Sequence, residues 1–98
     1  MLVKIHSSYR RMVAICDSEL LGKRFEEGEK AIEIKENFFK GEEKTESDIL
    51  KIIEESTGED ATFNIVGKDS VNVALKSGLV QPEGIIKIQG VPIALVLL

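Results

Sequence analysis

Residues 12–28 read Met-Val-Ala-Ile-Cys-Asp-Ser-Glu-Leu-Leu-Gly-Lys-Arg-Phe-Glu-Glu-Gly. The first five form an almost wholly apolar run, which is typical of a strand buried on both faces. The rest is a charged connection that carries the aromatic Phe25 and is bracketed by Gly22 and Gly28. Because glycines mark points where a chain turns, this stretch predicts a central strand followed by a compact, turn-rich connection.

The segments on either side of this stretch also have the pattern of strands. Residues 2–6 alternate between apolar and polar side chains, and residues 7–10 break the alternation before the central strand begins. This predicts a hairpin made of the first two strands. Residues 31–36 alternate again and predict a third strand, with Ile32 and Ile34 facing inward and Glu33 and Lys35 facing solvent.

Two later segments have the periodicity of helices. Thr45 to Asp48 resembles a capping box, after which isoleucines recur at helical spacing until Gly58. A second helix is predicted to begin with Asp69 or Ser70 as its cap and to end at Gly78.

Short apolar segments complete the chain. Residues 62–66 predict a strand before the second helix, and residues 85–88 and 93–98 predict two more after a turn at Pro82 and Gly84. We therefore predict a single α+β domain over residues 1–98. Its core should be a mixed, mostly antiparallel sheet of five to six strands with two helices.

The composition indicates the size of the core and the compartment in which we expect the protein. The chain has 98 residues, 43% of them hydrophobic, and a mean hydropathy of +0.00, which suits one modest core. Because a domain this small can complete an apolar face with a second copy, a homodimer is one expected form. The single cysteine closes no internal disulfide and no signal-peptide pattern is present, so we expect a cytoplasmic protein.

The longest uninterrupted apolar run, residues 91–98, contains Pro92 and is eight residues long. A membrane-spanning helix needs about 20 residues. We therefore expect no membrane partner.

The charge is unevenly distributed along the chain. The net charge is −4, but residues 1–24 carry +3, residues 25–60 carry −8 and residues 61–98 carry +1. Solubility alone accounts for such an imbalance in many proteins, yet the basic N-terminal part also permits an anionic partner.

Four ordered landmarks identify a resemblance. They are Cys-Asp-x-Glu-Leu-Leu-Gly-Lys-x-Phe-Glu-Glu-Gly at 16–28, Phe-Phe-Lys-Gly-Glu at 38–42, Asn-Ile-Val-Gly-Lys at 64–68 and Ile-x-Gly-Val-Pro at 88–92. From Val3 to Val96 the chain resembles the archaeal family called domain of unknown function 424. The resemblance implies an archaeal cytoplasmic protein without an assigned reaction and adds a link to translation or RNA as an expectation. A histidine often follows Gly-Val-Pro in that family, whereas this chain has Ile93, so no polar role is expected there.

Cys16 and His6 are the one pair with the chemistry of a nucleophile and its base. The apolar surroundings of Cys16 favour an inert structural thiol, and no third group that would orient the imidazole is evident. His6 shares a strand face with Lys4, which favours a solvated or partner-facing histidine. We therefore predict no catalytic residues, and a binding protein rather than an enzyme.

The inventory of ligands also argues against a metal site. A structural zinc site needs four sulfur or nitrogen ligands, and the chain has one cysteine and one histidine. The acidic residues Glu42, Glu43, Glu46 and Asp48 lack the spacing of a calcium loop and are predicted to form a solvated helix entrance. No metal and no cofactor is expected.

A weak anion-binding signal precedes the second helix. Gly67, Lys68 and Ser70 follow a strand and open a helix, where free backbone N–H groups can hold a phosphate. The segment lacks a phosphate-loop spacing, and Asp69 would repel an anion, so ordinary capping is the simpler interpretation.

The leading hypothesis is a non-enzymatic module that binds RNA or a ribonucleoprotein. Cations beside aromatic rings can contact phosphates while the rings stack on bases. The residues proposed for this role are Lys4, His6, Tyr9, Arg10, Arg11, Lys23, Arg24 and Phe25, and the hypothesis requires their loops to share one face. The alternative is an assembly subunit that docks through its apolar C-terminal strand or its acidic helix face, and a small enzyme using Cys16 and His6 is a third alternative.

Overall fold

Six strands form one mixed sheet in the computed structural model, which describes residues 1–7 and 10–98. Neighbouring strands are antiparallel, except for the central pair β2 and β6, which are parallel. This confirms the predicted fold class. The strands in their order across the sheet are β5 (Glu42–Glu43), β1 (Leu2–Ser7), β2 (Arg11–Cys16), β6 (Thr62–Val66), β8 (Val91–Leu97) and β7 (Ile86–Ile88).

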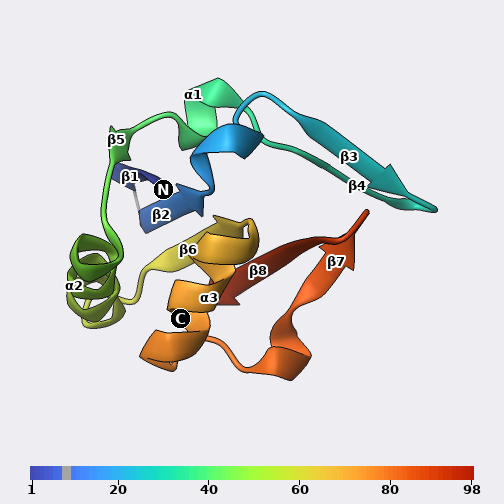
Figure 1. Ribbon diagram of the computed structural model, residues 1–98. Coiled ribbons are helices and arrows are strands. Elements are labelled where there is room, and N and C mark those ends of the chain that lie inside the picture. Colours follow the sequence, from blue (N-terminus) through green and yellow to red (C-terminus); the bar gives the residue numbers. More distant parts are fainter. Residues whose placement is uncertain (8–9) are drawn as a thin grey trace.

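Two helices, α2 (Glu46–Thr57) and α3 (Lys68–Ser77), cover one face of this sheet (Figure 1). Their buried side chains, among them Ile49 and Val71, pack with Val13 and Phe63 of the two central strands in one cluster. We call this side the helix face. Both predicted helices are confirmed, because each has an apolar stripe at the spacing that points toward a sheet.

The other face of the sheet, the open face, is only partly covered. A short helix α1 (Glu36–Phe39) and a separate two-stranded sheet of β3 (Arg24–Glu27) and β4 (Lys30–Glu33) lie over one end of it. The β3–β4 hairpin extends to one side of the main sheet and reaches the β7–β8 turn (Figure 1), where the Gln89 N–H donates to the Glu27 carboxylate at 2.7 Å. Two short 3-10 turns, η1 (Ser18–Leu20) and η2 (Pro82–Gly84), complete the fold.

The third strand predicted over residues 31–36 is shorter than expected and lies in a different sheet. β4 ends at Glu33 and pairs only with β3, while Lys35 is already the residue before α1. Ile34 is fully buried as predicted, but it contributes to a cluster under α1 rather than to a strand face of the main sheet. Alternation along the sequence shows which residues face inward and does not identify the partner strand.

Strand register aligns the side chains of the open face in rows. His6 pairs with Met12, Met12 with Thr62, and Thr62 with Leu97. The next row toward the covered end contains Lys4, Ala14, Asn64 and Leu95. Because paired residues share a face, both rows lie on the open face, where Ala14 and Thr62 are buried and Leu95 and Leu97 are exposed.

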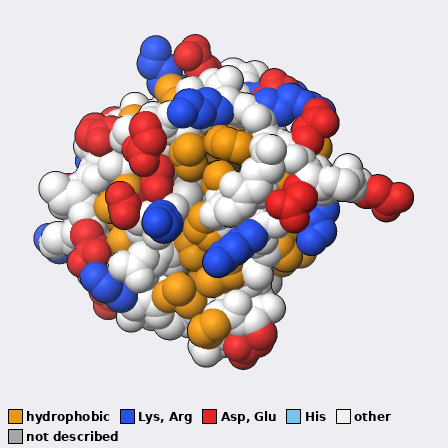
Figure 2. Space-filling view, turned by 45° about the vertical axis from the view of Figure 1, so that its right-hand side comes forward, with side chains coloured by type: hydrophobic (Ala, Val, Ile, Leu, Met, Phe, Trp, Pro, Cys, Tyr) orange, Lys and Arg blue, Asp and Glu red, His pale blue; other side chains and the backbone are white. Residues whose placement is uncertain are grey.

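Charged side chains of both signs surround hydrophobic ones on the surface seen in Figure 2. None of the helices in residues 1–7 and 10–98 is long and apolar enough to span a bilayer.

Candidate functional site

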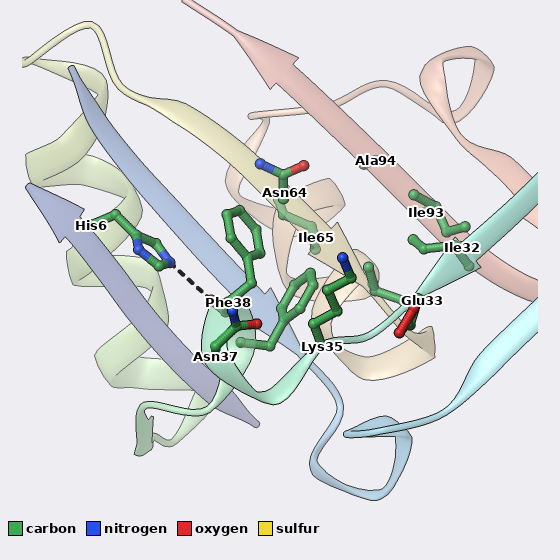
Figure 3. A pocket seen from close by; sticks show the side chains of 12 residues that line it. His6, Ile32, Glu33, Lys35, Asn37, Phe38, Asn64, Ile65, Ile93 and Ala94 are labelled. Atoms are coloured by element: carbon green, nitrogen blue, oxygen red, sulfur yellow. Dashed lines mark hydrogen bonds between the residues drawn. The ribbon is translucent and has the colours of Figure 1, made fainter. Parts of the chain in front are cut away.

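A pocket of about 530 Å³ lies on the open face, between the central strands and the segment from β4 to α1 (Figure 3). Its size falls in the range of ordinary ligand-binding pockets. Both apolar and polar side chains line it, which allows stacking and hydrogen bonding. The lining residues are His6, Ile32, Glu33, Lys35, Asn37, Phe38, Phe39, Asn64, Ile65, Val66, Ile93 and Ala94.

His6 and Phe38 form the aromatic wall of this pocket. The two ring centroids are 4.7 Å apart and the rings are nearly parallel, at 20°. The His6 Nε2 atom lies 2.9 Å from the Phe38 carbonyl oxygen. Because a carbonyl only accepts, Nε2 carries the hydrogen and, in a neutral ring, Nδ1 is left as an acceptor for a ligand. In Figure 3 the Phe38 side chain lies between His6 and Asn64.

Polar side chains from three elements surround the aromatic wall. Lys35 and Asn37 are exposed at the start of α1, Glu33 ends β4, and Asn64 is half-buried in β6. The Lys4 Nζ atom donates to the Asn37 carbonyl oxygen at 2.8 Å, which ties α1 to β1. The pocket therefore combines a planar ring system, amide groups that donate and accept, and a lysine that suits an anionic group.

The predicted basic loops lie at opposite ends of β2. Arg10 and Arg11 stand at its start, whereas Lys23 and Arg24 follow η1 beyond its end. Six residues of extended strand span about 17 Å. The structure therefore separates the two arginines from Lys23 and Arg24, whereas the RNA hypothesis requires their loops to share one face.

Most of these basic side chains already bind other parts of the chain. Arg10 Nε donates to the Asp60 carbonyl at 3.1 Å and its guanidinium also contacts the Leu98 carbonyl. Arg11 pairs with Glu59 at 2.8 Å, and Arg24 pairs with Glu26 at 2.6 Å.

The remaining residues of that prediction differ in setting. Phe25 is half-buried against the apolar cluster below the hairpin and is an anchor of β3. Tyr9 lies outside the described residues. Of the predicted set, His6 lines the pocket and Lys4 contacts its Asn37 wall.

The free N–H groups at the start of α3 bind a carboxylate from the same chain. The buried carboxylate of Asp17 accepts hydrogen bonds from the backbone N–H groups of Asp69 (3.1 Å) and Ser70 (2.8 Å) and from the Ser70 hydroxyl (2.7 Å). Gly67 is the N-cap residue of α3 and the Asp17 carboxylate binds the free N–H groups from outside the helix, so the predicted capping by Asp69 or Ser70 was wrong.

Gly67 makes room for this contact. Its φ is +112°, and a Cβ atom there would lie 2.3 Å from the Asp17 carboxyl carbon. Because Asp17 accepts from the amides of Asp69 and Ser70, an external anion at Gly67, Lys68 and Ser70 would have to displace this carboxylate.

Cys16 and His6 do not meet. Cys16 pairs with Leu2 and His6 with Met12, so they stand four strand residues apart, about 13 Å along the sheet. Cys16 is fully buried, and burial, helped by the nearby Asp17 carboxylate, raises the pKa of its thiol to about 11. In the described part of the chain, no three His, Cys, Asp or Glu residues converge as metal ligands.

Sequence reasoning missed Phe38, Lys35 and Asn64 as pocket residues. Phe38 belongs to the Phe-Phe-Lys-Gly-Glu landmark, but the sequence does not show which of two adjacent aromatic residues faces the core. Asn64 lies in an otherwise apolar strand. A polar residue interrupting such a strand was the available signal, because a buried sheet face seldom accepts an amide without a partner.

Comparisons with known proteins give a family and a fold. A model of the family described as "Protein of unknown function (DUF424)" matches residues 5–98. The chain is also similar to the crystal structure of an uncharacterized conserved protein from Methanopyrus kandleri. The TM-score is 0.84 at 26% identity, and the match covers 98% of this chain and 90% of that chain. No curated protein matches.

Proposed function

The chain belongs to the DUF424 family of proteins of unknown function, and on that premise we propose that it is a non-enzymatic module that binds single-stranded RNA. One base of the RNA enters the open-face pocket. The observation that carries the proposal is the stacked His6–Phe38 pair, which shares one pocket with Lys35 and Asn64. A cytoplasmic location and an archaeal origin are parts of the same proposal, the first because the lone buried thiol needs no oxidising compartment.

The chemistry of the pocket suits a nucleotide. An aromatic ring offers a stacking surface to any base. The Asn64 amide can pair with the edge of a base, as asparagine does with adenine. Lys35 supplies a positive charge for a phosphate, and the Glu33 carboxylate can accept a hydrogen from an amino group of the base.

Part of the acidic charge of the protein lies away from this site, although Glu33 lines the pocket and Glu36 begins α1 beside Lys35. Four acidic residues of the −8 segment lie in α2, which covers the helix face. They are therefore on the far side of the sheet from the pocket. Screening at physiological salt, over a distance of about 8 Å, further weakens their effect on an RNA at the open face.

The test is fluorescence anisotropy of labelled single-stranded and structured RNAs, at low and physiological salt. We expect saturable binding of the single-stranded RNA. The double variant Lys35→Ala with Asn64→Ala should bind about tenfold more weakly or worse, because it loses a phosphate contact and a base contact. Its dependence on salt should also flatten by roughly one phosphate contact.

The matched control is the double variant Lys87→Ala with Asn72→Ala. It removes the same residue types from exposed positions of β7 and α3, outside the pocket, and should keep the affinity. Thermal melts monitored by circular dichroism establish that both variants are folded. Equal affinities of the two double variants, or no saturable binding at low salt, would contradict the proposal.

A second variant separates the pocket from the basic loops. Alanine at Arg10, Arg11, Lys23 and Arg24 tests whether these cations contribute. Since three of them are held by carboxylates or carbonyls of the chain, we expect a smaller loss than for the pocket variant. A complete loss of binding in the four-alanine variant, together with full binding by the pocket variant, would show that RNA binds to the basic loops and not to the pocket.

A further inference from the structure

β8 has a free edge along its second half. β7 pairs with residues Val91 to Ile93 only, whereas β8 continues to Leu97. Within the described part of the chain, no strand lies beside the outer edge of residues 94–97. An unpaired edge of this kind is a template for adding another strand.

The hairpin geometry fixes which backbone groups point outward. Gln89 and Gly90 both have positive φ, at +51° and +79°, as in a two-residue type I′ turn. In such a hairpin the residues that close the turn, Ile88 and Val91, are a hydrogen-bonded pair. By alternation, the N–H and C=O groups of Leu95 and Leu97 point to the same outer side.

The side chains along this edge form an apolar strip. Ile86, Leu95 and Leu97 are 50%, 60% and 72% exposed, and register places all three on the open face. The side chains of residues 94–98 carry no charge, and the Arg10 guanidinium contacts the Leu98 carbonyl at the end of this strip. Exposed hydrophobic side chains that gather in this way mark an interaction surface rather than ordinary surface scatter.

We propose that the occupant of this edge is β8 of a second copy of the chain, paired antiparallel about a two-fold axis at Val96. Leu95 of each copy then lies opposite Leu97 of the other. The two pairs exchange four main-chain hydrogen bonds, because both residues direct their backbone groups outward.

Charge favours a second copy at this edge. Each copy carries a net charge of −4, so two copies repel each other at long range. The uncharged strip is a place where they approach without opposing like charges, and the leucines cover each other on one face. A stable dimer buries about 800 Å² per copy, roughly one seventh of the 5809 Å² that one copy exposes.

Sedimentation equilibrium and light scattering across the micromolar range test the proposal. We expect the mass to rise with concentration from 10.8 kDa toward twice that value, and added salt should not weaken the association because it screens the repulsion between the two net charges. The variant Leu95→Lys with Leu97→Lys should stay monomeric, or dissociate at least about tenfold more easily. These side chains are exposed, so the fold should survive, as a thermal melt would establish.

A backbone variant and a control complete the experiment. Leu97→Pro removes an N–H that points away from β6, so it should weaken the dimer and leave the monomer folded. Ile5→Lys changes another exposed hydrophobic residue, 39% exposed and on the helix face, and should dimerise normally. A wild-type chain that stays monomeric throughout, or a double-lysine variant that dimerises like wild type, would overturn the proposal. RNA binding through the pocket is measured separately and does not depend on this result.

Discussion

Asp17 joins two distant parts of the chain at the scale of a single side chain. It follows β2, yet its carboxylate accepts three hydrogen bonds at the start of α3. A buried carboxylate persists only where hydrogen bonds and a favourable field replace water. The helix N-terminus supplies both, through its free N–H groups and its positive dipole end.

Replacement of Asp17 should therefore destabilise the protein strongly. We expect Asp17→Ala to lower the free energy of unfolding by about 2–4 kcal/mol, because it leaves buried N–H groups without acceptors. Asp17→Asn should cost less, since one acceptor oxygen remains. Urea denaturation measures the change, with Glu19→Ala as the control for an exposed acid nearby. A loss below about 0.5 kcal/mol for Asp17→Ala would show that water replaces the carboxylate.

Cys16 gives a second prediction at the residue scale. Burial raises its pKa from the ordinary 9.0 to about 11, so at pH 8 about one thiol in a thousand is ionised in the folded protein. A thiol reagent should label the native chain slowly and the guanidinium-unfolded chain fast. Rapid labelling of the native protein would contradict this and revive the nucleophile hypothesis.

The raised pKa of Cys16 also makes the stability of the protein depend on pH. Between about pH 9 and 11 the unfolded chain loses the thiol proton first, so stability should fall as the pH rises through this window. Cys16→Ala should reduce that alkaline loss. An unchanged alkaline loss in the variant would assign it to other groups.

Short sequence motifs predict some features of the fold and not others. The start of α2 could be predicted from the sequence because its capping box lies within four residues. The Thr45 hydroxyl accepts from the Asp48 N–H at 3.2 Å, and the Asp48 carboxylate accepts in return from the Thr45 N–H at 3.4 Å. The cap of α3 was not readable, because Asp17 reaches it across 52 positions of the sequence. Sequence periodicity reports local structure, and only the fold reveals such a contact.

The capping box of α2 should contribute measurably to stability. Thr45→Ala should lower the free energy of unfolding by about 1 kcal/mol, whereas Ser47→Ala, in the exposed first turn, should have little effect. Chemical denaturation of both variants measures the difference. Equal effects of the two changes would mean that water replaces the hydrogen bonds of the capping box at no cost in stability.

The box should also weaken in acid. Hydrogen bonds from the Thr45 hydroxyl and backbone N–H hold the pKa of Asp48 below its ordinary 3.8. Stabilisation by this carboxylate is therefore present above that value and is lost as the pH falls through the lowered pKa. The difference between wild type and Thr45→Ala should shrink in the same acid range.

Some pocket residues could be predicted from the sequence and others could not, depending on the secondary-structure element that carries them. His6 and Lys4 were identified because their strand is regular, so their shared face followed from alternation. Phe38 and Lys35 lie on or beside α1, which has four residues and no periodicity to read. Its position over the open face depends on the burial of Ile34 and Phe39, a tertiary effect.

At the scale of the whole molecule, the position of a strand in the sheet should govern its protection. β2 and β6 have a strand on each side along their length and are covered by the helices. β5 and β7 are short edge strands, and β3 and β4 pair only with each other, outside the main sheet. Segment order was predictable from sequence, but sheet order was not, because several pairings satisfy the same apolar pattern.

Hydrogen exchange followed by mass spectrometry should therefore separate three groups of amides. β2 and β6 should exchange only on global unfolding, the edge strands earlier, and the hairpin first. Proton exchange in the hairpin that is as slow as in β2 would contradict this order.

The parallel pairing of β2 with β6 also has a consequence for biosynthesis. β2 leaves the ribosome while its partner and both α3 and β8 are still to be translated, since residues 17–61 separate the two strands. Until then its apolar side chains have only β1 beside them, and Asp17 has no helix to cap. The core therefore closes only after β6, α3 and β8 have been translated, and the interval before that is when a nascent chain is most exposed to misassociation or to capture by a chaperone.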